Sequence, residues 1–125
     1  MEKGTVYFFT GLSGADRLKG AYRVFRVARM LSEQGIDVIV CGICMYSQVR
    51  GWNRANIARY QEVYIKVKRD TLLARNQKGL YTSGKNVVGV GLPFDEPKTP
   101  DVTLENDGER SPEALVSSLE ARFGL

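Results

Sequence analysis

The sequence predicts an α/β fold in which helices cover a mostly parallel β-sheet, and three observations support this class. Runs of β-branched and aromatic residues at 5–10, 36–44 and 62–68 have the composition of buried strands. Helix-like segments at 17–34 and 46–60 separate these runs, as the crossovers between parallel strands require. The first run also ends in a glycine-rich turn, which is the order of elements at a phosphate-binding strand-to-helix junction.

The first helix is predicted to begin at Asp16 or Arg17 and to end at Gln34, before Gly35. Its apolar residues recur at steps of three and four, as on the buried face of an amphipathic helix. These apolar residues are Leu18, Ala21, Phe25, Ala28 and Leu31. The basic residues of this segment are Lys19, Arg23, Arg26 and Arg29. A solvated face is favoured over a nucleic-acid site for them, because no stacking aromatic residues interleave with the charges.

Residues 36–44 form an apolar run, which predicts a central strand buried on both faces. This run contains Cys41 and Cys44, a C-x-x-C spacing that in other contexts marks a thiol redox pair. On a strand, a spacing of three directs the two side chains to opposite faces, so two buried small residues are the favoured interpretation. The chain then continues through a helical crossover at 46–60 to the strand at 62–68.

The last third of the chain is predicted to contain a short helix at 70–77 and then a loop or lid. Residues 78–101 are rich in glycine and proline, with a possible short strand at 86–90, and residues 81–100 are assigned to the lid. A final strand is expected at 101–105. Ser111 and Pro112 then supply a cap and a first-turn proline for a helix that ends near Phe123.

The glycine-rich turn after the first strand departs from a triphosphate-binding loop. In the pattern G-x-x-x-x-G-K-[ST], a glycine approaches the phosphates, a lysine binds their outer oxygens and a hydroxyl binds magnesium. Counted from Gly11, these three places hold Asp16, Arg17 and Leu18. A carboxylate repels phosphate, and a leucine cannot bind a metal ion. Phosphoryl transfer from ATP is therefore expected to be impaired.

Composition limits the remaining functions. The 125 residues fit one domain, 1–125, and no apolar run reaches the roughly 20 residues that a membrane span needs. No leader-like segment is visible, so a cytoplasmic protein without membrane contact is expected. The net charge of +4 is too small to predict nucleic-acid binding. The sequence has no histidine, which excludes catalytic triads that depend on histidine and histidine-zinc sites.

Several segments, in order, resemble the adenylylsulfate kinase family and its shorter relatives of phosphoramidate and nucleotide-sugar pathways. The most specific segment is Lys78-Gly79-Leu80-Tyr81, followed by Pro93-Phe94-Asp95-Glu96-Pro97. The other matching segments are Phe9 to Gly14, Asp16-Arg17, Gly35 to Val40, Val49 to Asn56, Glu62 to Val67, Asn86 to Val90 and Pro100-Asp101. Their order and spacing make the set far more specific than any one segment.

The resemblance implies a P-loop kinase-like three-layer sandwich that transfers a phosphoryl group from MgATP to the ribose 3′-hydroxyl of adenylyl sulfate or a related nucleotide conjugate. It assigns phosphate binding to Gly11, Ser13 and Gly14. It assigns substrate binding to Arg17, Lys78, Gly79 and Leu80, and Arg50 or Arg54 takes the part of a basic loop residue of the family. Mg²⁺ is expected only together with ATP, and the resemblance identifies no catalytic residue and no metal ligand in this chain.

Relative to this family the chain is truncated. Between Gly14 and Asp16 it lacks roughly forty residues that would contain a helix, a strand and the phosphate lysine. Loss of that strand exposes apolar surface, so we expect a homo-oligomer or a partner subunit. Two hypotheses follow: an impaired kinase that binds ATP or ADP and adenylyl sulfate or a relative, and a non-catalytic nucleotide-binding or subunit-interaction protein.

Overall fold

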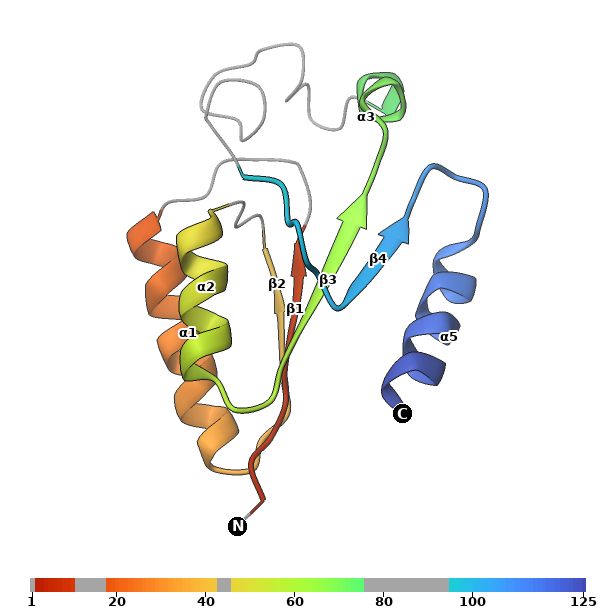
Figure 1. Ribbon diagram of the computed structural model, residues 1–125. Helices are drawn as coiled ribbons and strands as arrows, with labels where there is room; N and C mark the ends of the chain where they lie inside the picture. Colours follow the sequence, from red (N-terminus) through yellow and green to blue (C-terminus); the bar gives the residue numbers. More distant parts are fainter. Residues whose placement is uncertain (1, 11–17, 43–45, 76–94) are drawn as a thin grey trace.

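The structure is a computed structural model, and it describes residues 2–10, 18–42, 46–75 and 95–125. Within these ranges it contains a four-stranded parallel sheet with strand order β2-β1-β3-β4 (Figure 1). The strands are β1 (Val6–Thr10), β2 (Val38–Cys41), β3 (Tyr60–Lys66) and β4 (Val102–Glu105). The helices are α1 (Leu18–Glu33), α2 (Ser47–Asn56), α3 (Arg69–Arg75) and α5 (Pro112–Phe123). The predicted α/β class with a parallel sheet is confirmed.

Helices cover the sheet from both faces, which gives the three layers that the sequence predicts. Helices α1 and α2 lie side by side on one face, and α5 lies on the other (Figure 1). One core cluster joins α1 and α2 to the sheet and contains Phe8, Phe25 and Val49. A second, smaller cluster joins the sheet to α5 through Val63, Leu115 and Leu119. The sheet therefore separates two apolar layers.

Strand β1 occupies the interior of the sheet, with β2 and β3 as its neighbours. Because side chains alternate along a strand, Val6 and Phe8 pack on the α1 side, where neither is exposed to solvent. Tyr7 belongs to the opposite face, where its ring meets Phe123 of α5 edge to face at 4.9 Å. The alternating burial along β1 thus assigns Val6 and Phe8 to one face of the sheet and Tyr7 to the other.

Helix α1 confirms the predicted amphipathic pattern within its described bounds. Ala21, Phe25, Ala28 and Ser32 form the buried face of the helix. The helix ends one residue before the predicted Gln34, and Gly35 then adopts a positive φ of 84°, a conformation that glycine adopts without steric cost. The predicted start at Asp16 or Arg17 lies outside the described residues.

The prediction of a central strand at 36–44, buried on both faces, is wrong. Among the described residues, β2 covers Val38–Cys41 and lies at the edge of the sheet, with β1 as its strand neighbour. Ile39 is 69% exposed, and Cys41 is exposed rather than a buried small residue. An apolar run predicts a strand, but the number of its neighbours depends on which other strands exist. Residues 43–45, including Cys44, lie outside the described residues.

The crossover helix and the later strands are found where the sequence predicts them, with bounds that differ by a few residues. Helix α2 ends at Asn56, and β3 begins at Tyr60, so the predicted helix to residue 60 is too long and the predicted strand start at 62 is two residues late. Residues 95–101 contain no helix or strand, as a loop predicts, and β4 covers most of the expected 101–105. The possible strand at 86–90 lies outside the described residues.

The last helix confirms the capping signals of its sequence. Ser111 Oγ accepts a hydrogen bond of 3.1 Å from Ala114 N, and Pro112 is the first helical residue. Gly124 ends the helix with a φ of 70°. Among the described residues, no helix combines the length and the apolar character that crossing a bilayer would take.

Gly4 provides a test of how tightly the chain packs before β1. Its N–H donates a 2.7 Å hydrogen bond to Ser32 O, and a Cβ atom at this position would overlap the carbonyl oxygen of Ile36. We therefore expect Gly4→Ala to lower the free energy of unfolding by about 1–3 kcal/mol in urea titrations. The matched control is Gly51→Ala in α2, where a Cβ atom meets nothing within 4 Å. This control should raise stability by up to ~1 kcal/mol, and equal effects of the two substitutions would contradict the prediction.

Candidate functional site

A cleft of about 290 Å³ lies between α2 and residues 95–99, the segment that leads into β4. Glu62 of β3 also lines it. The full lining is Ser47, Arg50, Gly51, Arg54, Glu62, Asp95, Glu96, Lys98 and Thr99. Three cationic and three acidic side chains therefore share a small volume.

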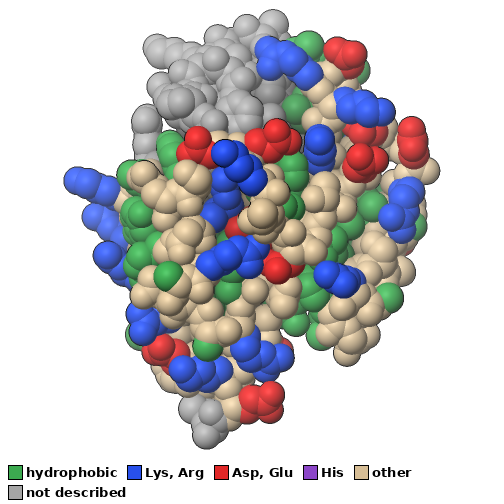
Figure 2. Space-filling model, in the orientation of Figure 1, with side chains coloured by type: hydrophobic (Ala, Val, Ile, Leu, Met, Phe, Trp, Pro, Cys, Tyr) green, Lys and Arg blue, Asp and Glu red, His purple; other side chains and the backbone are tan. Residues whose placement is uncertain are grey.

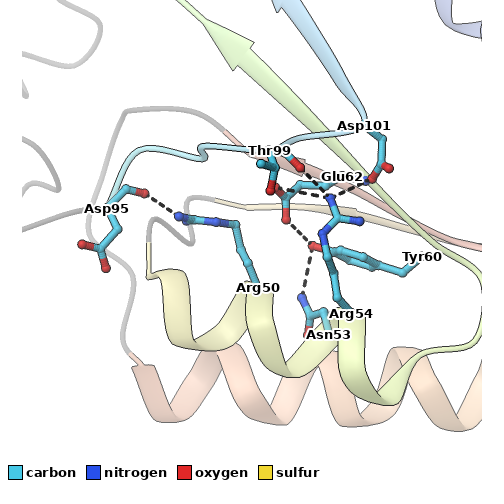
Figure 3. A network of polar contacts seen from close by, with 8 residues as sticks. All are labelled: Arg50, Asn53, Arg54, Tyr60, Glu62, Asp95, Thr99 and Asp101. Carbon is cyan, nitrogen blue, oxygen red and sulfur yellow. Dashed lines mark hydrogen bonds and ion pairs between the residues drawn. The ribbon is translucent and has the colours of Figure 1, made fainter.

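Arg50 and Arg54 lie one helical turn apart on α2, so both side chains point toward the 95–101 segment (Figure 3). Arg50 is buried, and its Nη2 donates a 2.8 Å hydrogen bond to the carbonyl oxygen of Asp95. The Asp95 carboxylate accepts two further bonds of 3.1 Å from the N–H and hydroxyl of Ser47. These bonds lower the pKa of Asp95, so the carboxylate that joins α2 to this segment stays ionised.

Arg54 of α2 also binds the 95–101 segment, and it contacts β3 as well. Its Nη2 lies 3.0 Å from Thr99 O, 3.0 Å from Asp101 Oδ2 and 3.8 Å from Glu62 Oε2. Asp101 Oδ2 also accepts a 2.7 Å hydrogen bond from the backbone N–H of Glu62. One guanidinium and one carboxylate thus fix the 95–101 segment to both α2 and β3, which sets the position at which β4 joins the sheet.

Beneath Arg54, three buried polar residues form a chain of hydrogen bonds (Figure 3). Asn53 Nδ2 donates to Tyr60 Oη at 3.4 Å, and Tyr60 Oη donates to Glu62 Oε1 at 2.9 Å. The guanidinium of Arg54 lies 5.2 Å from the centre of the Tyr60 ring, a cation–π distance. Tyr60 therefore connects the core to the charged cleft.

Burial is the largest cause of the pKa shifts of Glu62 and Tyr60 in this series of hydrogen bonds. Glu62 is 3% exposed, and this desolvation raises its pKa, although the bond from Tyr60 and the charges of Arg54 and Arg50 partly oppose the shift. Burial and the nearby Glu62 carboxylate likewise raise the pKa of Tyr60, which keeps its hydroxyl a donor. At the open side, burial and the hydrogen bond to Glu96 raise the pKa of Tyr64 to about 12.

Of the residues predicted to bind substrate, the structure brings Arg50 and Arg54 together in this cleft. In the structure both side chains donate hydrogen bonds to the 95–101 segment and so connect it to α2. The predicted phosphate-binding residues Gly11, Ser13 and Gly14 and the predicted substrate-binding residues Arg17, Lys78, Gly79 and Leu80 lie outside the described residues.

Sequence reasoning missed the acidic and aromatic members of the network, Glu62, Asp101 and Tyr60. The available signal was Glu62 itself, a charged residue inside a strand-like segment, since a buried carboxylate needs a partner. Its partners come from α2 and from the 95–101 segment, where Asp101 lies 39 residues later in the chain. No local pattern would have connected them.

The described residues do not offer a magnesium site. Among them, no three His, Cys, Asp or Glu side chains lie together in a group that could hold a metal ion. Leu18, at the place where a phosphate loop has its metal-binding hydroxyl, packs instead against the core cluster of α1 and α2. The leucine side chain at this place offers no ligand to a magnesium ion.

Comparison with solved structures places this architecture among P-loop kinase-type α/β proteins. The structure of the Mycobacterium tuberculosis APS kinase CysC in complex with AMPPNP and APS aligns with a TM-score of 0.79 at 19% identity. The alignment covers 98% of this chain and 99% of that one. At this identity the likeness establishes the fold alone.

The chain belongs to the adenylylsulphate kinase family, whose model matches residues 7–105. It is 33% identical over 114 residues to a cytidine diphosphoramidate kinase of Campylobacter jejuni, covering 87% of this chain and 66% of that protein. It is 31% identical over 123 residues to an adenylyl-sulfate kinase of Myxococcus xanthus, covering 88% and 64%. The chain thus spans slightly less than two thirds of the length of these two curated relatives.

Proposed function

We propose that this chain is a nucleotide phosphotransferase of the adenylylsulfate kinase type, with ATP as donor and a nucleotide conjugate as acceptor. Membership of the family over residues 7–105 is the observation that carries the proposal. The relatives named above act on adenylyl sulfate and on cytidine diphosphoramidate, as their names state. Both compounds join a nucleotide to a small acidic group, so the acceptor class is a nucleoside phosphate conjugate. The proposed location is the cytoplasm, where ATP is available.

In this proposal, the turn after β1 binds phosphate through Gly11, Ser13 and Gly14. Arg17 and the Lys78-Gly79-Leu80 segment bind the acceptor. Arg50 and Arg54 act on the acceptor side by holding residues 95–101, the end of the proposed lid, against α2 and β3. Mg²⁺ enters as MgATP, bound by the nucleotide's own phosphates. Because Asp16 and Leu18 replace the usual phosphate-loop residues, we expect slow transfer.

A second candidate is a non-catalytic protein that retains nucleotide binding. The observation that favours it is the position of Leu18, whose side chain belongs to the core rather than to a metal site. Such a protein would bind the acceptor through the Lys78-Gly79-Leu80 segment without transferring phosphate. The two candidates differ only in the appearance of product.

The test combines ligand-induced stabilisation with product analysis on the same samples. Melting temperatures are measured with MgATP, ADP, adenylyl sulfate and cytidine diphosphoramidate, and 3′-phosphorylated product is then quantified by chromatography. A ligand at 100 times its dissociation constant should stabilise the fold by about 2.7 kcal/mol. Stabilisation by ATP and by one acceptor, together with product, supports the kinase. Stabilisation without product supports the non-catalytic candidate, and no stabilisation by any of the four compounds rejects both.

A variant locates the acceptor site. Lys78→Ala should abolish stabilisation by the acceptor and leave stabilisation by ATP intact, because a single positive charge at this position contacts only the acceptor in the proposed arrangement. Lys19→Ala, an exposed lysine of α1, is the matched control. Equal loss of ATP and acceptor binding in Lys78→Ala would contradict the assignment of this segment to the acceptor.

A further inference from the structure

Strand β2 ends the described sheet on an open edge beside an apolar groove. Among the described residues it pairs with β1 alone, so the N–H and C=O groups along its other side have no described strand partner. The groove lies between this edge and helix α1. Its described lining is Arg23, Val24, Val27, Ala28, Leu31, Val38, Ile39, Val40 and Cys41. An unpaired strand edge next to an apolar groove can accept an added strand.

The side chains of this groove set the pattern that an added strand would need. Ile39 is 69% exposed, Val27 51% and Val24 49%, so no described residue covers the surface. On β2, Val38 and Val40 pack toward the core cluster that contains the buried face of α1. Because side chains alternate along a strand, a strand added beside β2 would place every second side chain over the same helix. Two of these alternate positions would lie over Val24 and Val27 and would favour apolar residues.

The end of the groove beside the carboxyl end of β2 is positively charged. Helix α1 runs opposite to β2, so its first turns lie at that end of the strand (Figure 1). Lys19 and Arg23 belong to these turns, and neither forms an ion pair within the described part of the chain. The one acid of α1, Glu33, is paired with Arg29 at the far end of the helix. Figure 2 shows Lys and Arg side chains along this side of the molecule, with hydrophobic side chains beside them.

We propose that this groove binds an extended segment of another polypeptide, which adds to the edge of β2 as a parallel strand. All described strand pairs are parallel, so the added strand would continue the sheet in the same direction. The segment carries two apolar residues at alternate positions, over Val24 and Val27, and an acidic residue two positions later, beside Arg23. The strand edge supplies backbone hydrogen bonds, the apolar groove selects the side chains, and the charge of Arg23 sets the register.

The edge strands of a second copy of this chain do not have this pattern. The two edges of the described sheet are β2 and β4. Strand β2 has the sequence Val-Ile-Val-Cys and contains no acidic residue. In β4, Val102 and Leu104 are apolar at alternate positions, but the residues that precede and follow them in this series, Pro100 and Asn106, carry no charge. The acidic residue beside Arg23 therefore points to a different polypeptide.

The first test measures the binding of two fluorescein-labelled peptides of about seven residues, the length of an ordinary strand. One is Ser-Val-Thr-Val-Thr-Asp-Ser, and the other has lysine in place of the aspartate. Fluorescence anisotropy should show saturable binding of the aspartate peptide with a dissociation constant below about 1 mM. The lysine peptide should bind about fivefold more weakly, because it places like charges together at the surface. No saturable binding of the aspartate peptide, or equal binding of the two, overturns the proposal.

Variants of the chain then test the charge and the apolar floor of the groove. Arg23→Glu should reverse the preference, so that the lysine peptide binds about fivefold more tightly than the aspartate peptide. Val27→Gln should weaken both peptides. The matched control is Val116→Gln on α5, which is 52% exposed outside the groove and should leave both affinities unchanged. Circular dichroism shows that each variant is folded. An unchanged preference in Arg23→Glu contradicts the proposed register.

Methylation of the peptide backbone tests whether a strand is added. Successive N–H groups of a strand point to opposite sides, so N-methylation of the valines and N-methylation of the threonines remove different rows of donors. Only one row faces β2, so exactly one of the two methylated aspartate peptides should lose binding. If both bind as well as the parent peptide, no strand pairs with β2. A signal that falls at high concentrations of the chain would assign the groove to a second copy and would also overturn the proposal.

Discussion

Phe25→Ala is expected to lower the free energy of unfolding by about 3–5 kcal/mol. Phe25 is 1% exposed and meets Phe8 of β1 edge to face, with ring centroids 4.8 Å apart. It is thus the main aromatic contact between α1 and the interior strand. A domain of this size has about 5–15 kcal/mol of total stability, so this one substitution removes a large share. Urea titration followed by far-ultraviolet circular dichroism measures the loss.

Two further variants separate the cavity from other effects of this substitution. Phe25→Leu keeps most of the apolar volume and should cost about 1–2 kcal/mol. Arg26→Ala changes the next, exposed residue of the same helix and should stay within about 0.5 kcal/mol of the parent. If Phe25→Ala costs no more than Arg26→Ala, then Phe25 does not anchor α1 on the sheet.

Those elements of the fold that depend on local patterns could be predicted from the sequence. Helix α1 was predictable because its buried face repeats at the helical period, and α5 because Ser111 and Pro112 mark its start. The place of β2 was not predictable from its own residues. Its apolar run is typical of a central strand, and only the absence of a further paired strand among the described residues leaves Ile39 exposed. An edge is a property of the sheet rather than of the strand.

In the candidate site, too, some features could be predicted from the sequence and others depend on contacts between distant residues. Arg50 and Arg54 could be selected because a resemblance pointed to them, and the structure places both in one cleft. Their contacts with the 95–101 segment could not be predicted, since the partner atoms are backbone carbonyls and a carboxylate more than forty residues away. Long-range polar pairing leaves no periodic signal in a single sequence, whereas buried apolar residues do.

The second large effect is expected from Arg54→Met, which removes the cation beside a buried carboxylate. The Glu62 side chain is 4% exposed, and that of Arg54 is 38% exposed, so solvent screens part of the interaction. We expect a loss of about 1–3 kcal/mol at pH 8, below the range for fully buried pairs. Arg59→Met is the matched control, because its partner Glu2 is 88% exposed and its loss should be under about 0.5 kcal/mol.

A double-mutant cycle with Glu62→Gln identifies the cause of this loss. Glutamine keeps the shape of the side chain and its acceptor for the Tyr60 hydroxyl but carries no charge. If Arg54 stabilises the fold by compensating the Glu62 charge, then Arg54→Met should cost less in the Glu62→Gln background, by about 0.5–2 kcal/mol. Effects that simply add within about 0.3 kcal/mol would instead assign the role of Arg54 to its bonds with Thr99 and Asp101 alone.

The pH dependence of stability gives an independent readout of the same pair. Burial raises the pKa of Glu62 above its ordinary value of 4.5, so between these two values the folded protein binds more protons than the unfolded chain. The contribution of this group is complete below pH 4.5 and is lost as pH rises through the folded pKa. Stability of the parent minus that of Glu62→Gln should therefore fall across this interval. Arg54→Met removes a charge that lowers the folded pKa of Glu62, so the fall should still begin near pH 4.5 but extend to higher pH. An unchanged profile would show that the two side chains are not coupled.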